Sequence, residues 1–102
     1  MKYYSKDING KVTEIREDAK SVFYGNKNLI EVGLPEGAVD VFLHNNNLTE
    51  LKLPKGVETV CCENNNLIKL ELPKGVKDVY CDYVKGISKQ FHKVEKQILI
   101  YI

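Results

Sequence analysis

The stretch GVETVCCENNNLIKLELPK, from Gly56 to Lys74, decides the fold, because the preceding sequence is a copy of it. That copy, GAVDVFLHNNNLTELKLPK from Gly37 to Lys55, is identical at 10 of 19 positions without a gap. The identities include the Asn-Asn-Asn-Leu run, two further leucines and the final Pro-Lys. A fixed period of about 20 residues is typical of a solenoid, in which each unit buries its apolar side only by stacking on its neighbours.

The same period extends beyond these two copies and places one short run of strand-forming residues in each unit. Six runs fit the spacing: Tyr3-Tyr4-Ser5, Val22-Phe23-Tyr24, Val41-Phe42-Leu43, Val60-Cys61-Cys62, Val79-Tyr80-Cys81 and Ile98-Leu99-Ile100. We therefore expect a mainly β solenoid with a parallel sheet of about six strands.

The rest of each unit is a return path that has no room for a helix. An Asn-rich bend follows each strand, then spaced leucines, then a Pro-x-Gly corner such as Pro54-Lys55-Gly56. Proline ends a helix and biases the residue before it toward extended geometry, and glycine favours a turn. We expect an extended return path and a thin β-coil.

The two ends depart from the repeat. Asn9-Gly10, between short alternating runs in residues 6–17, predicts a hairpin-like N-terminal cap. Near the other end Phe91, Val94 and Ile98 fall at helical spacing, which predicts a short capping helix from about 89 to 96. We expect one domain over residues 1–102, with an N-terminal cap (1–17), repeats (18–86) and a C-terminal cap (87–102).

The composition gives little reason to expect nucleic acid or a membrane as partner. The 102 residues have a formal net charge of +1, and no segment is long and apolar enough for a signal peptide or a bilayer span. The three cysteines, Cys61, Cys62 and Cys81, are an odd number without a secretory signal. They favour free thiols and a cytoplasmic location, in a host or bacterial cytosol.

The pattern Val57-x-x-Val60-x-Cys62-x-x-Asn65-x-Leu67 resembles the leucine-rich repeat signature L-x-x-L-x-L-x-x-N-x-L. The L-P-x-G link is similar to that of short bacterial, phage and viral repeats of this family. The resemblance covers residues 18–86. It implies a non-enzymatic domain that recognises another protein through its parallel sheet. Lys27 and Val84 stand where the family has asparagine, so we expect those units to lack part of an asparagine ladder.

The family signature turns the first and third residues of each strand run inward, so the middle residue points outward. The outward residues form one row across the sheet, and four of its six members are aromatic. This predicted stripe consists of Tyr4, Phe23, Phe42, Cys61, Tyr80 and Leu99. Flanking outward positions carry Asp40 and Asp78 on one side, and His44, Glu63 and Asp82 on the other.

An apolar centre with a charged rim is the anatomy of a protein interface, and aromatic residues are enriched at its hot spots. We expect the partner to be another protein with a basic and apolar contact surface. The same stripe could instead form a homodimer interface or stabilise the sheet through cross-strand contacts. The expected partner-binding residues are Tyr4, Phe23, Asp40, Phe42, His44, Cys61, Glu63, Asp78, Tyr80 and Asp82.

The sequence supports a metal-binding or catalytic role for this face less than it supports protein binding. His44, Glu63 and Asp82 could share a metal, but one imidazole and two carboxylates in open solvent lack supporting groups. Cys61 with His44 as base would need a third orienting group and an oxyanion hole, which nothing predicts. We expect no enzyme activity, no cofactor and no metal. The leading hypothesis is a phage or bacterial modulator or inhibitor of a cellular protein. The alternative is a homo-oligomeric structural protein that uses the same face or the terminal strand 98–102.

Overall fold

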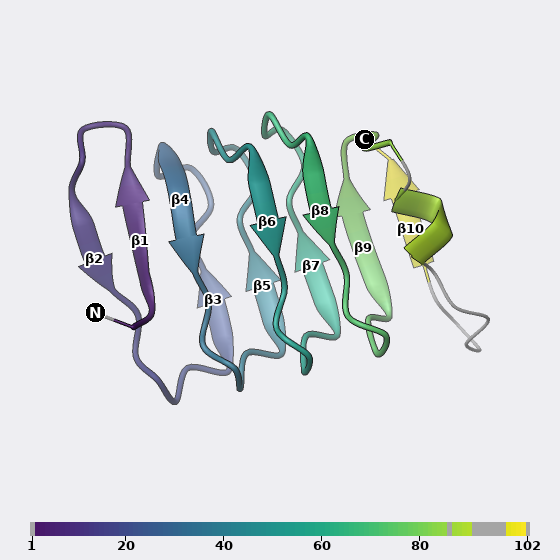
Figure 1. The fold of residues 1–102 in the computed structure, drawn as a ribbon, viewed down its shortest axis with the longest axis horizontal. Coiled ribbons are helices and arrows are strands. Elements are labelled where there is room, and N and C mark those ends of the chain that lie inside the picture. Colours follow the sequence, from purple (N-terminus) through teal and green to yellow (C-terminus); the bar gives the residue numbers. More distant parts are fainter. Residues whose placement is uncertain (1, 86, 91–97, 102) are drawn as a thin grey trace.

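The computed structural model describes residues 2–85, 87–90 and 98–101 (Figure 1). The chain forms a flat coil with extents of 39 × 27 × 17 Å. Among the described residues there is no α-helix, and no helix is long and apolar enough to cross a membrane. The elements are β1 (Tyr4–Asp7), β2 (Val12–Glu14), β3 (Ser21–Phe23), β4 (Leu29–Gly33), β5 (Asp40–Phe42), β6 (Glu50–Lys52), β7 (Thr59–Cys61), β8 (Lys69–Glu71), β9 (Asp78–Cys81), the 3-10 helix η1 (Ile87–Gln90) and β10 (Ile98–Tyr101).

Successive turns of the coil pair through a parallel sheet with the order β10-β9-β7-β5-β3. Val41 lies opposite Val22 on one side and Val60 on the other, and Val60 lies opposite Val79. Each of these steps equals one sequence repeat, so hydrogen bonding between strands keeps the period seen in the sequence. The expectation of a mainly β solenoid with stacked parallel strands is confirmed.

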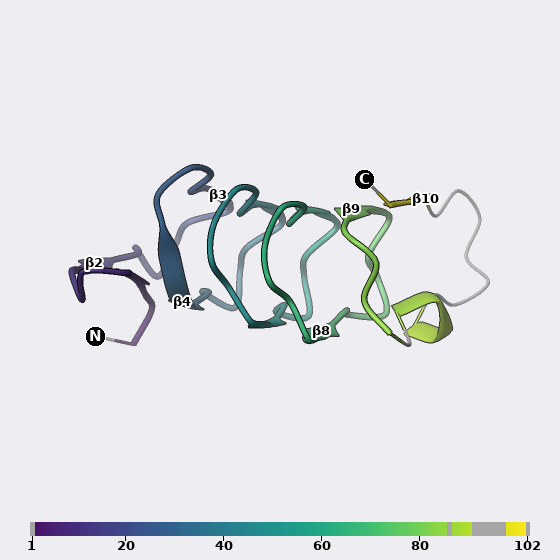
Figure 2. The same ribbon diagram turned by 90° about the horizontal axis from the view of Figure 1, so that it is seen from above.

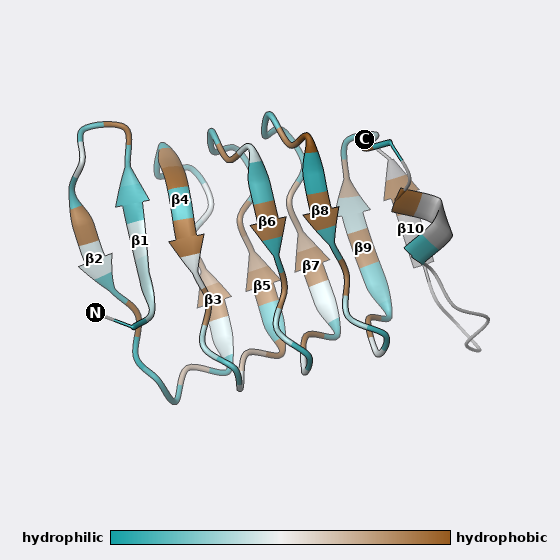
Figure 3. Cartoon of the chain, in the orientation of Figure 1, coloured by the Kyte–Doolittle hydropathy of each residue, from teal (hydrophilic) through white to brown (hydrophobic). Residues whose placement is uncertain are grey.

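The core lies between the parallel sheet and the return path, which form two walls (Figure 2). The inward residues predicted from the signature are fully buried: Val41, Leu43, Val60, Cys62, Val79 and Cys81. Leu51 of β6 and Leu70 of β8 close the core from the other wall. In Figure 3 the middle of β6 and the middle of β8 are hydrophobic, with hydrophilic segments on either side. Each unit therefore buries its apolar side chains only against the units beside it.

The return path is extended, as expected, and β6 and β8 pair in parallel on that wall. The Pro-x-Gly corners are turns in which the proline carbonyl accepts a hydrogen bond from the residue three positions later. Pro54 O accepts from Val57 N at 3.2 Å, and Pro73 O accepts from Val76 N at 3.2 Å. The corner is therefore a tight turn that leads the chain from the return wall into the next strand of the parallel sheet.

The first expected strand of the parallel sheet lies elsewhere, and this corrects the predicted six-strand sheet. The hairpin of β1 and β2 forms as expected, but β1 also pairs antiparallel with β4, so the hairpin extends the return wall. The repeat spacing identifies a strand-forming run at Tyr4 and cannot tell which wall that run joins. The turn after Asp7 sends the chain back along β1, and Asp7 Oδ1 accepts from Lys11 N at 3.0 Å.

The last strand joins the parallel sheet with a different register. Ile98 pairs with Asp78 and Ile100 with Tyr80, a step one position longer than in the earlier turns, so Ile100 rather than Leu99 stands beside Tyr80. The last turn contains η1 in place of an extended corner, so its residue count differs. The predicted capping helix over 89–96 falls mainly on residues 91–97, which lie outside the described residues.

Asparagine side chains bind the bends together. The Asn46 carboxamide accepts from Lys27 N and Leu29 N, both at 3.0 Å, and donates to Tyr24 O at 2.8 Å and Leu43 O at 2.9 Å. Asn65 repeats the pattern one turn later. It accepts from Leu48 N at 3.0 Å and donates to Leu43 O and Cys62 O. These amides satisfy backbone groups that the bends would otherwise leave unpaired.

A second ladder, which the sequence did not predict, runs along the outside of the bends. Asn45 Nδ2 donates to Asn26 Oδ1 at 2.9 Å, and Asn64 Nδ2 donates to Asn45 Oδ1 at 2.7 Å. All three residues have φ between 56° and 58°, a left-handed conformation that asparagine tolerates better than most residues. In each Asn-Asn-Asn run, the side chain of the first residue therefore makes hydrogen bonds on the surface, and that of the second makes them in the interior.

Replacing Asn46 by Ala should lower the free energy of unfolding by about 2–4 kcal/mol, because several backbone groups lose their partner. Urea denaturation followed by circular dichroism measures the change. Asn66→Ala is the matched control, since its side chain is exposed and makes no hydrogen bond with a described residue. Equal stability of the two variants would contradict the role assigned to Asn46.

Candidate functional site

The outward side of β3, β5, β7, β9 and β10, here called the sheet face, carries a continuous apolar row. The register places neighbouring members side by side on successive strands. With about 4.8 Å between strands, the row is about 19 Å long. It consists of Phe23, Phe42, Cys61, Tyr80 and Ile100, and is here called the central row.

The central row is open to solvent at its ends and half-buried in the middle. Phe23 is 63% exposed and Ile100 is 40% exposed, whereas Phe42, Cys61 and Tyr80 are intermediate. Phe23 and Phe42 stack with ring centroids 4.9 Å apart and an interplanar angle of 18°. Such a contact contributes about 0.5–1.5 kcal/mol beyond area burial. It stabilises the sheet edge and leaves one face of the aromatic pair toward solvent.

Cys61 interrupts the aromatic residues between Phe42 and Tyr80. It is a free thiol. Desolvation raises its pKa to about 11, with smaller contributions from the nearby Glu63 and Asp78 carboxylates. A thiol with a raised pKa is a poor nucleophile near neutral pH, so its environment opposes a catalytic role. Its side chain is smaller than those of Phe42 and Tyr80 on the neighbouring strands.

The rim of the sheet face is acidic. Asp40, Thr59 and Asp78 flank the central row on one side, and His44, Glu63 and Asp82 flank it on the other. At the outward positions of β3, β5, β7 and β9 and of the residues that follow them, there are four carboxylates and no lysine or arginine. The rim of the sheet face is therefore negatively charged.

Asp82 already has a structural role. Asn26 N donates to His44 O, and Asn45 N donates to Glu63 O. In the next turn the Asp82 side chain takes the place of the carbonyl, since Oδ2 accepts from Asn64 N at 2.7 Å. The carboxylate of Asp82 thus closes the series of bends. The sequence pattern predicts its place on the rim and does not predict this hydrogen bond.

His44 and Glu63 contain polar atoms without a partner. Nδ1 of His44 and Oε2 of Glu63 are buried and make no hydrogen bond with a described residue. The His44 ring lies over Gly25, where an added Cβ would come within 2.4 Å of Nε2. An unpaired buried polar group costs about 1–3 kcal/mol, so a donor to Glu63 would be stabilising.

Tyr4 does not belong to the sheet face, which corrects its predicted place in the stripe. It lies on β1 opposite Gly33 of β4, with its ring 3.3 Å from the position of a Cβ on Gly33. Its hydroxyl donates to the Glu31 carboxylate, and this hydrogen bond is the main cause of its raised pKa. The other nine predicted site residues come together on the sheet face.

The described residues contain no group of three His, Cys, Asp or Glu side chains that could hold a metal ion. The row of His44, Glu63 and Asp82 thus lacks the geometry that a metal ion requires. In addition, Oδ2 of Asp82 already accepts a hydrogen bond from Asn64 N. Ile100 and the close approach of the His44 ring to Gly25 are features of the face that the sequence did not predict. The one-residue shift of β10 places Ile100 in the row in place of Leu99, and the repeat spacing does not reveal this shift. The contact with Gly25 depends on the orientation of the His44 ring.

Comparisons of the chain with protein-family models, with curated proteins and with solved structures found no match.

Cys61 should react with iodoacetamide at about pH 8 roughly a hundredfold more slowly than a cysteine in an unstructured peptide, because its raised pKa leaves less thiolate. The rate should rise about tenfold per pH unit until the pH approaches 11. Mass spectrometry of the native protein measures the labelling. Cys61→Ser is the control, since Cys62 and Cys81 are buried. A rate equal to that of the free peptide would contradict the desolvated environment.

Proposed function

We propose that this chain is a leucine-rich-repeat type of protein-binding module, without enzyme activity, which binds a partner protein through the sheet face. The observation that carries the proposal is the central row, in which Phe23, Phe42 and Tyr80 lie in register with Cys61 and Ile100 on an open sheet. Aromatic side chains are common anchors at interfaces because they bury a large area with few rotatable bonds.

The small side chain of Cys61 supports a specific contact. Its neighbours Phe42 and Tyr80 are larger, and all three are half-buried. An apolar side chain of the partner would fill the space between the two rings and exclude water from it. Hot spots of this kind lie near the centre of an interface, inside a ring of weaker contacts.

The acidic rim supports a basic partner surface. Asp40 and Asp78 have no ion-pair partner among the described residues, and Oε2 of Glu63 lacks a hydrogen bond. A small rotation of the Glu63 carboxylate toward a partner lysine or arginine would supply the missing donor. Such pairs increase the association rate and fix the orientation of the partner.

The setting follows from the resemblance to short bacterial, phage and viral repeats. The proposed module acts in the cytoplasm, where its three thiols stay reduced. As a phage or bacterial modulator it would inhibit a cellular protein by covering the surface that this protein needs.

The test replaces two central residues by lysine. Phe42→Lys with Tyr80→Lys should leave the circular dichroism spectrum unchanged, since both side chains lie outside the core, and should weaken binding at least about a hundredfold. Partners are identified by affinity capture with the native chain and mass spectrometry, and each is then measured by calorimetry with purified protein.

Ile30→Lys with Ile68→Lys is the matched control. Both isoleucines are exposed, 42% and 77%, and both lie away from the sheet face. The control should keep full affinity. Full affinity of the Phe42 and Tyr80 variant would refute the assignment of the sheet face.

A second candidate function is self-association, because β10 is the last strand of the parallel sheet. An apolar edge strand can pair with another chain, and Ile98, Leu99 and Ile100 are apolar. Light scattering at increasing protein concentration separates the two functions. The binding module is expected to stay monomeric, whereas a dimer that Ile100→Lys dissociates would support the structural alternative.

A further inference from the structure

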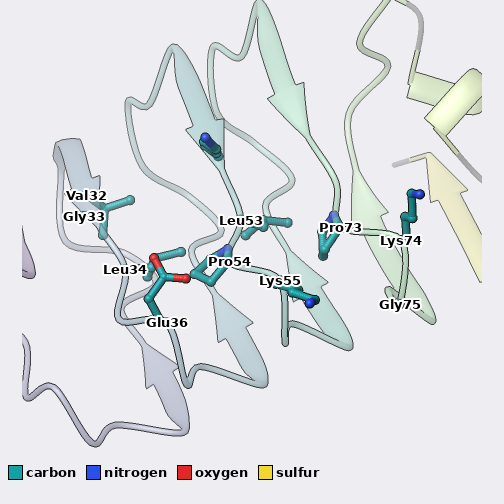
Figure 4. Close-up of a pocket in the computed structure, with 11 residues that line it drawn as sticks. Val32, Gly33, Leu34, Glu36, Leu53, Pro54, Lys55, Pro73, Lys74 and Gly75 are labelled. Atoms are coloured by element: carbon teal, nitrogen blue, oxygen red, sulfur yellow. The ribbon is translucent and has the colours of Figure 1, made fainter.

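A groove on the return wall crosses three successive turns of the coil, away from the sheet face (Figure 4). Its volume is about 960 Å³, and it is open rather than enclosed. Ligand sites typically have volumes of about 300–1,000 Å³. An open groove of this size suits a segment of extended chain better than an enclosed small molecule. It is here called the corner groove, because the Pro-x-Gly corners form much of its lining.

The floor of the corner groove is apolar. Leu34 and Leu53 lie at its base and are almost fully buried, while Val32, Pro54 and Pro73 are partly exposed. The repeat requires these residues, since the Leu-Pro pair ends each return strand. Because these residues are aligned over three turns, they form a continuous apolar strip. Contact of this strip with water is unfavourable.

The rim of the corner groove carries unpaired positive charge. Lys52, Lys55 and Lys74 line it and are exposed. Elsewhere on the surface Lys69 pairs with Glu71 and Lys77 pairs with Glu58. The ammonium groups of the three groove lysines have no ion-pair partner among the described residues.

Two of these lysines repeat at the same corner position. Glu36, Lys55 and Lys74 follow one another at intervals of one repeat, on turns that lie about 4.8 Å apart. Figure 4 shows them on successive corners. The two neighbouring ammonium groups repel each other, and an anion bound between them would offset this repulsion. The backbone N–H groups of Lys55 and Lys74 also lack an acceptor among the described residues, so they can donate to the same anion.

We propose that the corner groove is a second binding site, and that it takes an extended acidic peptide segment of a partner protein. Alternate side chains of an extended segment point to opposite sides, with about 6.6 Å between every second residue. Apolar side chains would lie on the floor formed by Leu53, Pro54 and Pro73. Acidic side chains would reach the ammonium groups of Lys55 and Lys74. Glu36 disfavours an acidic side chain at its own end of the groove.

The charge of the whole chain argues for a peptide over a polyanion such as nucleic acid. The formal net charge is only +1, and the sheet face is acidic, so a long polyanion gains little from the protein outside the groove. A short segment would meet the lysines and avoid the carboxylates. The proposal is independent of the partner on the sheet face.

The experiment uses a fluorescein-labelled peptide that alternates Glu and Leu, with fluorescence anisotropy as the readout. The native chain should bind it. Lys55→Glu with Lys74→Glu should weaken binding at least about tenfold, because attraction becomes repulsion at both lysines. Both side chains are exposed, so the variant should fold, and circular dichroism checks this.

Lys11→Glu with Lys20→Glu makes the same change in net charge outside the groove and should leave the affinity unchanged. Phe42→Ala with Tyr80→Ala should also leave it unchanged, which separates this site from the sheet face.

Three results would overturn the proposal. The first is absence of binding to the native chain. The second is an equal loss in the Lys11 and Lys20 variant, which would show an effect of net charge alone. The third is equal competition by single-stranded oligothymidylate, which would show a surface for any polyanion.

Discussion

The carboxamides of Asn46 and Asn65 are the constraint on which the rest of the structure depends. A coil with so short a repeat must bend sharply after every strand, and each bend turns backbone groups into the interior, where water cannot reach them. One amide side chain donates and accepts at once, so a single residue per turn satisfies groups in its own bend and in the preceding one. The bends can then stack at the strand spacing, and the valines and leucines of adjacent turns come into contact.

Much of this fold could be predicted because the period determines it. The inward positions of β5, β7 and β9, the extended return path and the N-terminal hairpin all follow from local spacing and turn residues. The central row from Phe23 to Tyr80 follows from the same register. The pairing of the two ends with the rest of the coil could not be predicted, because each end has a neighbouring turn on one side only. Tyr4 joins the return wall through long-range pairing with β4, and β10 shifts by one residue. The corner groove was also missed, since periodicity does not show where lysines lack partners.

The two surfaces of the coil carry opposite charge, although the whole chain is almost neutral. The sheet face has four carboxylates and no lysine or arginine at the outward positions of β3, β5, β7 and β9 and of the residues that follow them. The corner groove has three lysines and one glutamate. A solenoid allows this separation because each repeat position forms its own column, so a substitution changes one column without affecting the others. The net charge of the whole chain therefore does not reveal either charged surface.

The series of bends that begins at Asn26 ends at Asp82, whose side chain takes the place of a carbonyl, and this has a consequence for how such a chain changes length. A second copy of residues 56–74, inserted by duplication directly after the first, would have a turn of the same kind before it and the present next turn after it. The closing role of Asp82 would be unaffected. Each added copy would lengthen the sheet face by about 4.8 Å and add one outward residue to the central row. The length of the sheet face can therefore change separately from the two ends that terminate the coil.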